Sequence, residues 1–184
     1  MHPTVPDNST RQRILAATAE VLGRNGTAKL SLSEVATQAG VSRPTLYRYF
    51  ADKRELLDVF VVWERQYYER AIAKATADLP AHERLDAALR VIVEYQLSYP
   101  GLRMVDVEPD QVIKRMERVL PLMRERLQRL CTGPDAALSA ATAVRVAISQ
   151  YLVRSDDSDD FLAQLRHAAR ARYQRAASPE VVQG

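Results

Sequence analysis

The 184-residue sequence has few of the residues from which covalent or metal-bound sites are built. Its one cysteine, Cys131, excludes an internal disulfide and fits a reducing cytoplasm. The three histidines, His2, His82 and His167, lie far apart, and no Cys or His pair has the spacing of metal ligands. We therefore predict no metal, no cofactor and no enzymatic activity.

Long apolar runs and glycines are also scarce. No run approaches the roughly 18 apolar residues of a membrane-spanning helix, and residues 1–9 lack the basic and apolar blocks of a signal peptide. We expect a cytoplasmic protein without a membrane partner. Six glycines and heavy use of Ala, Leu, Arg and Glu predict an all-α fold.

The most informative pattern lies in residues 31–53. Ser31 can cap a first short helix, and Gly40 can end it in the left-handed conformation. Ser42 can cap a second helix with Pro44 in its first turn, where a missing N–H costs no hydrogen bond. The spacing predicts a helix-turn-helix whose second helix enters the major groove of DNA.

Polar and aromatic side chains on and around that second helix are the predicted DNA contacts. Arg43 can donate two hydrogen bonds to guanine, and the methyl group of Thr45 can meet that of thymine. Tyr47 and Tyr49 can reach phosphate or sugar, and Lys53 starts a helix whose N–H groups also favour phosphate. The alternative is an ordinary surface helix. The full predicted set is Ser31, Ser33, Ser42, Arg43, Pro44, Thr45, Tyr47, Arg48, Tyr49 and Lys53.

Charge is unevenly distributed along the chain. From Arg24 to Arg54 there are six basic and two acidic residues, whereas from residue 64 onward 18 basic residues nearly balance 17 acidic ones. A solvated helix face could carry this excess, but its coincidence with the motif favours DNA. Leu46 and Phe50 differ from their neighbours, because their spacing assigns them to the core.

Residues 11–60 resemble the DNA-binding domain of the TetR family of bacterial transcriptional regulators. Pro44 and Leu22 depart from the family pattern, which often has glycine and phenylalanine there, and Pro44 removes one possible close approach of the backbone to DNA. The resemblance implies a homodimer on a palindromic operator and a C-terminal domain that binds a small effector. It is carried by Arg13-Ile14-Leu15, Gly26, Val35-Ala36, Ala39-Gly40-Val41-Ser42, Thr45-Leu46-Tyr47, Tyr49-Phe50, Lys53 and Leu56.

The domain organisation follows from the periodicity and the breaks. Gly26 predicts the end of a first helix, and Pro121 predicts a kink or boundary within a later one. Longer helices are expected over 53–78, 82–99, 110–131, 135–153 and 159–175. We expect a disordered lead-in over 1–9, a helix-turn-helix domain over 10–54, a C-terminal ligand-binding and dimerisation domain over 55–177, and a loose tail over 178–184.

Aromatic and methionine side chains in the C-terminal helices are the candidate ligand-binding residues. The resemblance implies a mainly apolar cavity there. The alternative is that these side chains are plain core. The candidates are Trp63, Tyr67, Tyr68, Tyr95, Tyr99, Met104, Met116 and Met123.

Small residues in the last two helices predict close packing across a two-fold axis, as a four-helix bundle. Arg166, Arg170 and Arg172 could flank that seam. The alternative is that these helices complete the core of a monomer. The predicted interface residues are Ala136, Ala140, Ala143, Ala147, Phe161, Leu165 and Ala168.

These features predict a DNA-binding transcriptional regulator, in the first place a repressor, that a small and mainly apolar effector releases from its operator. Its expected partners are double-stranded DNA, the effector and a second copy of the chain. Two alternatives stay open. One is a DNA-binding protein whose C-terminal domain only dimerises, and the other is a helical ligand-binding protein or enzyme that keeps the motif as a relic.

Overall fold

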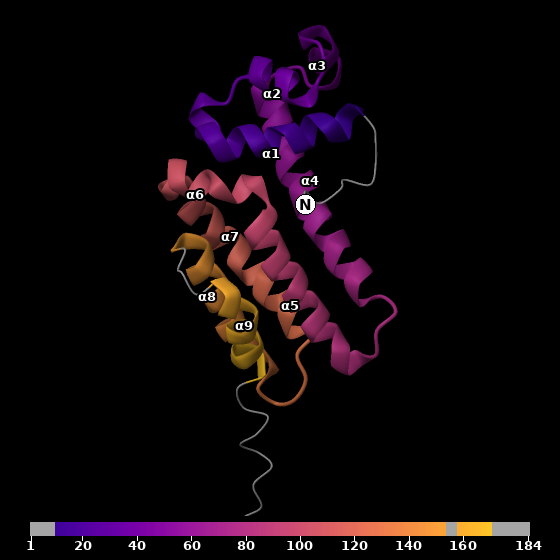
Figure 1. Ribbon diagram of the computed structural model, residues 1–184, viewed down its shortest axis with the longest axis vertical. Coiled ribbons are helices and arrows are strands. Elements are labelled where there is room, and N and C mark those ends of the chain that lie inside the picture. Colours follow the sequence, from indigo (N-terminus) through magenta and orange to yellow (C-terminus); the bar gives the residue numbers. More distant parts are fainter. Residues whose placement is uncertain (1–9, 154–157, 171–184) are drawn as a thin grey trace, which may run out of the picture. The chain divides into compact units, whose positions relative to one another are not determined.

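The computed structural model describes residues 10–153 and 158–170 (Figure 1). Within these ranges every regular element is a helix, which confirms the predicted all-α class. The expected lead-in over 1–9, the end of the last helix and the tail over 178–184 lie outside the described residues. The chain forms two compact units: one runs to Lys74 and includes Glu94–Lys114, and the other comprises Ala75–Val93 and the residues from Arg115 onward.

The first unit contains the helix-turn-helix and the elements that pack with it. Its core is formed by fully buried apolar side chains, among them Ile14, Val35, Leu46 and Leu56. Leu46 and Phe50 are both buried, as their spacing predicts. The elements of this unit are α1 (Thr10–Lys29), α2 (Leu32–Ala39), α3 (Arg43–Tyr49), most of α4 (Lys53–Thr76), the end of α5 (Ala81–Ser98), η1 (Pro100–Arg103), α6 (Met104–Val107) and the start of α7 (Pro109–Gln128).

Gly26 interrupts the first helix, as the sequence predicts. It lies inside α1 with φ 72° and ψ 179°, and the helix resumes after it as far as Lys29. An L-residue other than glycine would be strained at this φ, so the break depends on glycine. The predicted end of the first helical segment at Gly26 is therefore confirmed, and a short second segment follows it as far as Lys29.

The second unit is built from α5 up to Val93, α7 from Arg115, α8 (Ala136–Leu152), η2 (Ser158–Asp160) and α9 (Phe161–Arg170). Helices α8 and α9 pack closely against each other. Helix α7 runs through Pro121 as one helix, so the chain has no helix boundary there. Because proline has no N–H, the carbonyl of Glu117 loses the hydrogen bond that residue 121 would otherwise donate. Pro121 and Glu117 are both exposed, so water can hydrate this carbonyl.

Within the described ranges, no helix combines the length and apolarity needed to cross a bilayer.

Candidate functional site: a DNA-binding surface and an aromatic ladder

Helix α3 is held by its inner side and its first turn. Ser42 caps the helix by accepting a hydrogen bond from the backbone N–H of Thr45 at 3.2 Å. The hydroxyls of Ser42 and Thr45 also bond each other at 2.8 Å, which directs the Thr45 methyl group away from that bond. Because Leu46 is fully buried, the outer side of α3 is presented to solvent.

The predicted DNA contacts on α3 lie on that outer side. Ser42, Arg43, Pro44 and Arg48 are exposed, as are Tyr47 and Tyr49 at 47% and 37%. The guanidinium of Arg48 lies over the ring of Tyr49, 5.8 Å from its centroid, so these two side chains support each other. A short helix whose exposed residues include two basic groups and two tyrosyl hydroxyls is suited to reading a groove edge and touching phosphate.

Three predicted phosphate contacts, Ser31, Ser33 and Lys53, lie at the N-terminal ends of the neighbouring helices α2 and α4. Ser31 caps α2 by accepting from the N–H of Ser33 at 3.2 Å, and its own O–H proton stays available to a phosphate. Both serines are half-buried. Lys53 begins α4, and its Nζ donates to the backbone carbonyl of Ala28 at 3.0 Å, which leaves two of its three donors.

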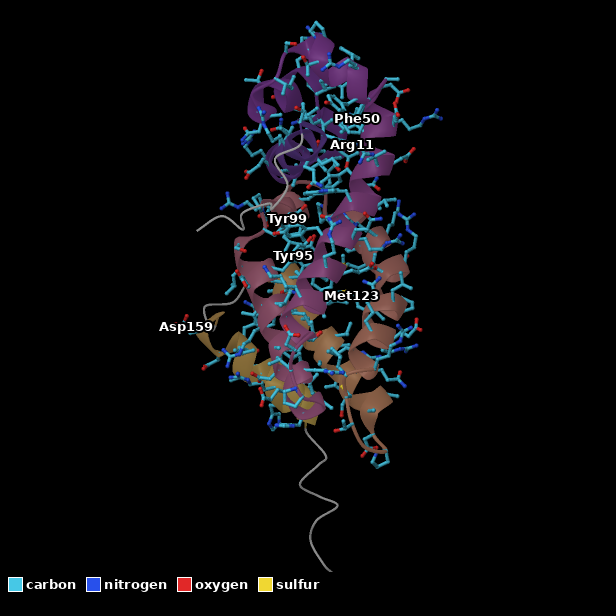
Figure 2. All side chains as sticks on the ribbon, turned by 90° about the vertical axis from the view of Figure 1, so that its right-hand side faces the viewer. Arg11, Phe50, Tyr95, Tyr99, Met123 and Asp159 are labelled. Carbon is cyan, nitrogen blue, oxygen red and sulfur yellow. The ribbon has the colours of Figure 1, made fainter. Side chains whose placement is uncertain are left out.

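Long-range contacts to α1 fix the turn between α2 and α3. A guanidinium nitrogen of Arg13 donates to the carbonyls of Ala39, at 2.7 Å, and Gly40, at 3.1 Å. Gly40 has φ 65°, the left-handed conformation predicted for it. Arg11 lies over the ring of Phe50, 5.8 Å from its centroid, where α3 ends (Figure 2). Sequence reasoning used Arg13 only as part of the family pattern and gave neither Arg13 nor Arg11 a structural role, because contacts across 26 or more residues leave no local pattern.

A second residue missed by the sequence reasoning is Glu108, which directly follows α6. Its carboxylate accepts from the backbone N–H groups of Thr27 at 2.8 Å and Ala28 at 2.7 Å. Burial by itself would raise the pKa of Glu108, but these N–H donors and the charge of Lys53 outweigh it, so the pKa is lowered. Glu108 is therefore ionised at neutral pH and caps the part of α1 that resumes after Gly26.

Six aromatic rings from α4, from the end of α5 and from the residue that follows α5 form a continuous series, which we call the aromatic ladder: Phe60, Trp63, Tyr67, Tyr99, Tyr95 and Tyr68. Successive ring centroids are 5.9, 5.7, 6.5, 4.5 and 5.2 Å apart. The closest pair, Tyr95 and Tyr99, is stacked with an interplanar angle of 16° (Figure 2). The structure thus brings together five of the eight predicted ligand-binding residues.

Two polar atoms of the ladder are buried without a hydrogen bond of good geometry in the described part of the chain: the indole N–H of Trp63 and the hydroxyl of Tyr99. Their side chains are 6% and 7% exposed. Burial raises the pKa of Tyr99, and neighbouring Tyr95 offsets this only in part. Since buried donors are normally paired, both atoms are places where water or a ligand could bind.

The three predicted methionines are distributed over both units. Met104, on α6, is buried in the first unit. Met116 and Met123 lie on the part of α7 that belongs to the second unit, and both are half-buried. Among the described residues, no group of three or more His, Cys, Asp or Glu side chains is arranged to hold a metal ion.

The predicted dimer-interface residues are mostly buried within the single chain. Ala140, Ala143, Phe161 and Leu165 have no exposed surface, and Ala147 and Ala168 have at most 6%. Only Ala136 is half-exposed. These side chains have little surface left for a partner subunit, so their role in an interface stays a prediction. Of the flanking arginines, the side chain of Arg170 and all of Arg172 lie outside the described residues.

Comparison with known proteins agrees with this arrangement. A family model described as "Bacterial regulatory proteins, tetR family" matches residues 14–59. An uncharacterised HTH-type transcriptional regulator of Mycobacterium tuberculosis is 29% identical over 86% of this chain and 76% of its own length. The HTH-type transcriptional repressor LfrR of Mycolicibacterium smegmatis is 37% identical over 54% of this chain and 51% of its own length.

The fold also matches solved structures. A TetR transcription regulator from Haloarcula marismortui superimposes with a TM-score of 0.66 at 19% identity, covering 90% of this chain and 97% of that one. The capped recognition helix and the helices that hold it define a helix-turn-helix DNA-binding protein. Residues 14–59 match the TetR family of bacterial regulatory proteins, and the fold of the chain is similar to that of TetR-like transcriptional regulators. These similarities support a DNA-binding transcriptional regulator over a helical ligand-binding protein or enzyme that keeps the motif as a relic.

Proposed function

We propose that the protein is a cytoplasmic repressor that binds a palindromic operator as a homodimer and is released by a small, mainly apolar effector. The observation that carries this proposal is the continuity of α4. One helix bears Lys53, a predicted phosphate contact, at its start and Trp63, Tyr67 and Tyr68 of the aromatic ladder further along. A ligand that repacks the ladder would therefore act on the same rigid element as the DNA.

The effector site is proposed at the aromatic ladder. Stacked rings favour a flat apolar molecule, and the unpaired indole N–H of Trp63 favours one that carries a hydrogen-bond acceptor. Release requires that the effector prefers the conformation with the lower DNA affinity, because a ligand with equal affinity for both states shifts nothing. The relative named as a repressor supports the direction of control.

The dimer is proposed to form through α8 and α9. Because the small side chains of α8 pack inward, the partner would meet the opposite side of this helix, where Leu138 and Leu152 are 47% and 36% exposed. Arg145 and Ser149 lie on that side at helical spacing and are exposed too. A two-fold arrangement would place two recognition helices about 34–36 Å apart for half-sites one turn apart.

The first experiment is selection of genomic fragments that bind the purified protein, followed by footprinting of the strongest fragment. We expect a palindromic footprint occupied by two protomers. If no fragment is enriched over bulk DNA at physiological salt, the proposed function is wrong.

The second experiment uses the fluorescence of Trp63, the only tryptophan of the chain. A panel of flat apolar compounds with hydrogen-bond acceptors is screened for those that quench this fluorescence and also dissociate the selected fragment. Trp63→Phe is the matched variant, because it keeps one aromatic ring in the ladder and removes the N–H donor together with the second ring of the indole. We expect it to bind the fragment normally and to require more compound for release.

The alternative of a protein whose C-terminal region only dimerises makes a different prediction. Under it, water would satisfy the Trp63 N–H, and no compound would change both the fluorescence and the DNA affinity. Fragment selection would still succeed, so the two experiments separate the alternatives.

A further inference from the structure

Ala28 is bonded on both sides of its backbone by charged side chains that lie far apart in the sequence. Its N–H donates to Oε1 of Glu108 at 2.7 Å, and its carbonyl accepts from Nζ of Lys53 at 3.0 Å. One residue of α1 thus connects the end of α6 with the start of α4. All three residues belong to the first compact unit.

The carboxylate of Glu108 is closely fitted against α1. Its second oxygen accepts from the N–H of Thr27 at 2.8 Å, so both oxygens hold the backbone. A Cβ placed on Gly26 would lie 2.7 Å from Cδ of Glu108. Gly26 therefore provides both the backbone conformation and the space for the carboxylate, which holds the backbone at Thr27 and Ala28.

The segment that supplies Glu108 is itself seated on α1. The carbonyl oxygen of Pro100, at the start of η1, lies so close to Gly23 that a Cβ there would collide with it. Met104 and Val105 of α6 are buried. With contacts at Gly23 and at Thr27, the segment from Pro100 to Glu108 is fixed to the second half of α1.

We propose that Glu108 is a positioning residue for DNA binding: through the backbone of Ala28 it sets the place of the Lys53 ammonium, which keeps two donors for a phosphate. The proposal rests on the proposed function, because it takes Lys53 as a phosphate contact. A lysine side chain has four rotatable bonds, and the Ala28 carbonyl anchors its end only while the backbone at Ala28 is held in place. Glu108 thereby contributes to affinity without touching DNA.

If Glu108 acted only through its negative charge, its removal would have the opposite effect on DNA affinity. A carboxylate near Lys53 reduces the positive potential that phosphate meets, so removing its charge would tighten binding if Glu108 acted only through its field. If Glu108 positions Lys53, removing it weakens binding. The direction of the change therefore separates the two explanations.

The test is a double-mutant cycle on the selected genomic fragment, with binding measured by fluorescence anisotropy. Glu108→Gln, Lys53→Met and the double variant are compared with the wild type, and Asp110→Asn, an exposed site on α7, is the charge-matched control. We expect Glu108→Gln to weaken binding about 3- to 30-fold in the wild-type background. We expect a loss of less than about twofold in the Lys53→Met background, and none for the control.

Equal or tighter binding by Glu108→Gln, or the same loss in both backgrounds, would overturn the proposal. Glu108→Asp is measured in parallel, because it keeps the charge but is too short to bridge both N–H groups. It should weaken binding, whereas a purely electrostatic role predicts no change, so the test stands even if Glu108→Gln does not fold. Failure of the wild type to bind any fragment would instead contradict the proposed function.

Discussion

Arg166 on α9 and Asp86 on α5 form a two-point ion pair within the second unit. Nε of Arg166 donates to Oδ1 of Asp86 at 2.6 Å, and a terminal guanidinium nitrogen donates to Oδ2 at 2.9 Å. The sequence analysis placed Arg166 beside a dimer seam. The structure shows that its guanidinium is engaged inside the subunit, where it ties the last helix to α5.

This ion pair predicts a pH-dependent stability. The hydrogen bonds from Arg166, with help from Arg90, lower the pKa of Asp86 from 3.8 to about 2. A lowered folded-state pKa stabilises the protein above the unfolded value, and the contribution is lost as pH falls from about 4 to 2. Because both side chains are partly exposed, we expect Asp86→Asn to lower the free energy of unfolding at pH 7 by about 1–2 kcal/mol.

Urea unfolding of the wild type and of Asp86→Asn between pH 7 and pH 3 measures this contribution. The difference in free energy of unfolding between the wild type and Asp86→Asn should become smaller as the pH falls toward 3. Arg90→Ala is the control, since Arg90 is 63% exposed and its Nε bonds Oδ2 of Asp86 at the longer distance of 3.1 Å. The cost of Arg90→Ala in free energy of unfolding should stay below about 0.5 kcal/mol. A pH-independent difference would contradict the account.

Gly23→Ala should destabilise the protein, although alanine is normally the better helix former. A Cβ at this position would collide with the carbonyl oxygen of Pro100. The propensity gain of about 1 kcal/mol should therefore be outweighed by a steric cost of about 1–3 kcal/mol. Thermal unfolding followed by circular dichroism checks this, and a higher melting temperature would show that the segment from Pro100 does not rest on α1.

Substitutions on opposite sides of α8 should have different effects. Ala140 has no exposed surface, so Ala140→Glu should unfold the second unit by placing a charge in its core. Leu138 is 47% exposed, and Leu138→Glu should leave the subunit folded but separate a dimer into monomers. Sedimentation velocity at micromolar concentration, together with circular dichroism, distinguishes these results. If the Leu138→Glu protein remains dimeric, the exposed side of α8 does not form the dimer interface.

Features that depend on near neighbours in the sequence could be predicted. The caps at Ser31 and Ser42 and the left-handed Gly40 need only bonds within about five residues, and all three are present. The contacts of Arg13 with Gly40 and of Glu108 with Ala28 join residues 27 and 80 positions apart. No local sequence pattern indicates such contacts, so the roles of Arg13 and Glu108 in holding the DNA-binding helices were not predicted.

The alanines of α8 and the aromatic residues show a second limit. Small residues at helical spacing predict close packing, but the spacing is the same whether the partner helix belongs to the same chain or to another. Ala140, Ala143 and Ala147 pack within the chain. The predicted aromatic rings do contact one another, but two of the three methionines predicted with them, Met116 and Met123, belong to the other unit. Periodicity shows which side of a helix is buried, but it does not show which other helix packs against that side.

The central claim is that α3 reads the bases of DNA and that Lys53 binds the DNA backbone. It is tested most directly by the affinity of two variants, Arg43→Ala and Lys53→Ala, for the selected fragment and for single-base variants of that fragment. The affinity is measured over a range of salt concentrations. Arg43→Ala should lose about 1–3 kcal/mol of discrimination at one base position. Lys53→Ala should weaken binding to all sequences alike and lower the salt slope by about one unit. Wild-type affinity, specificity and salt dependence in both variants would contradict the account.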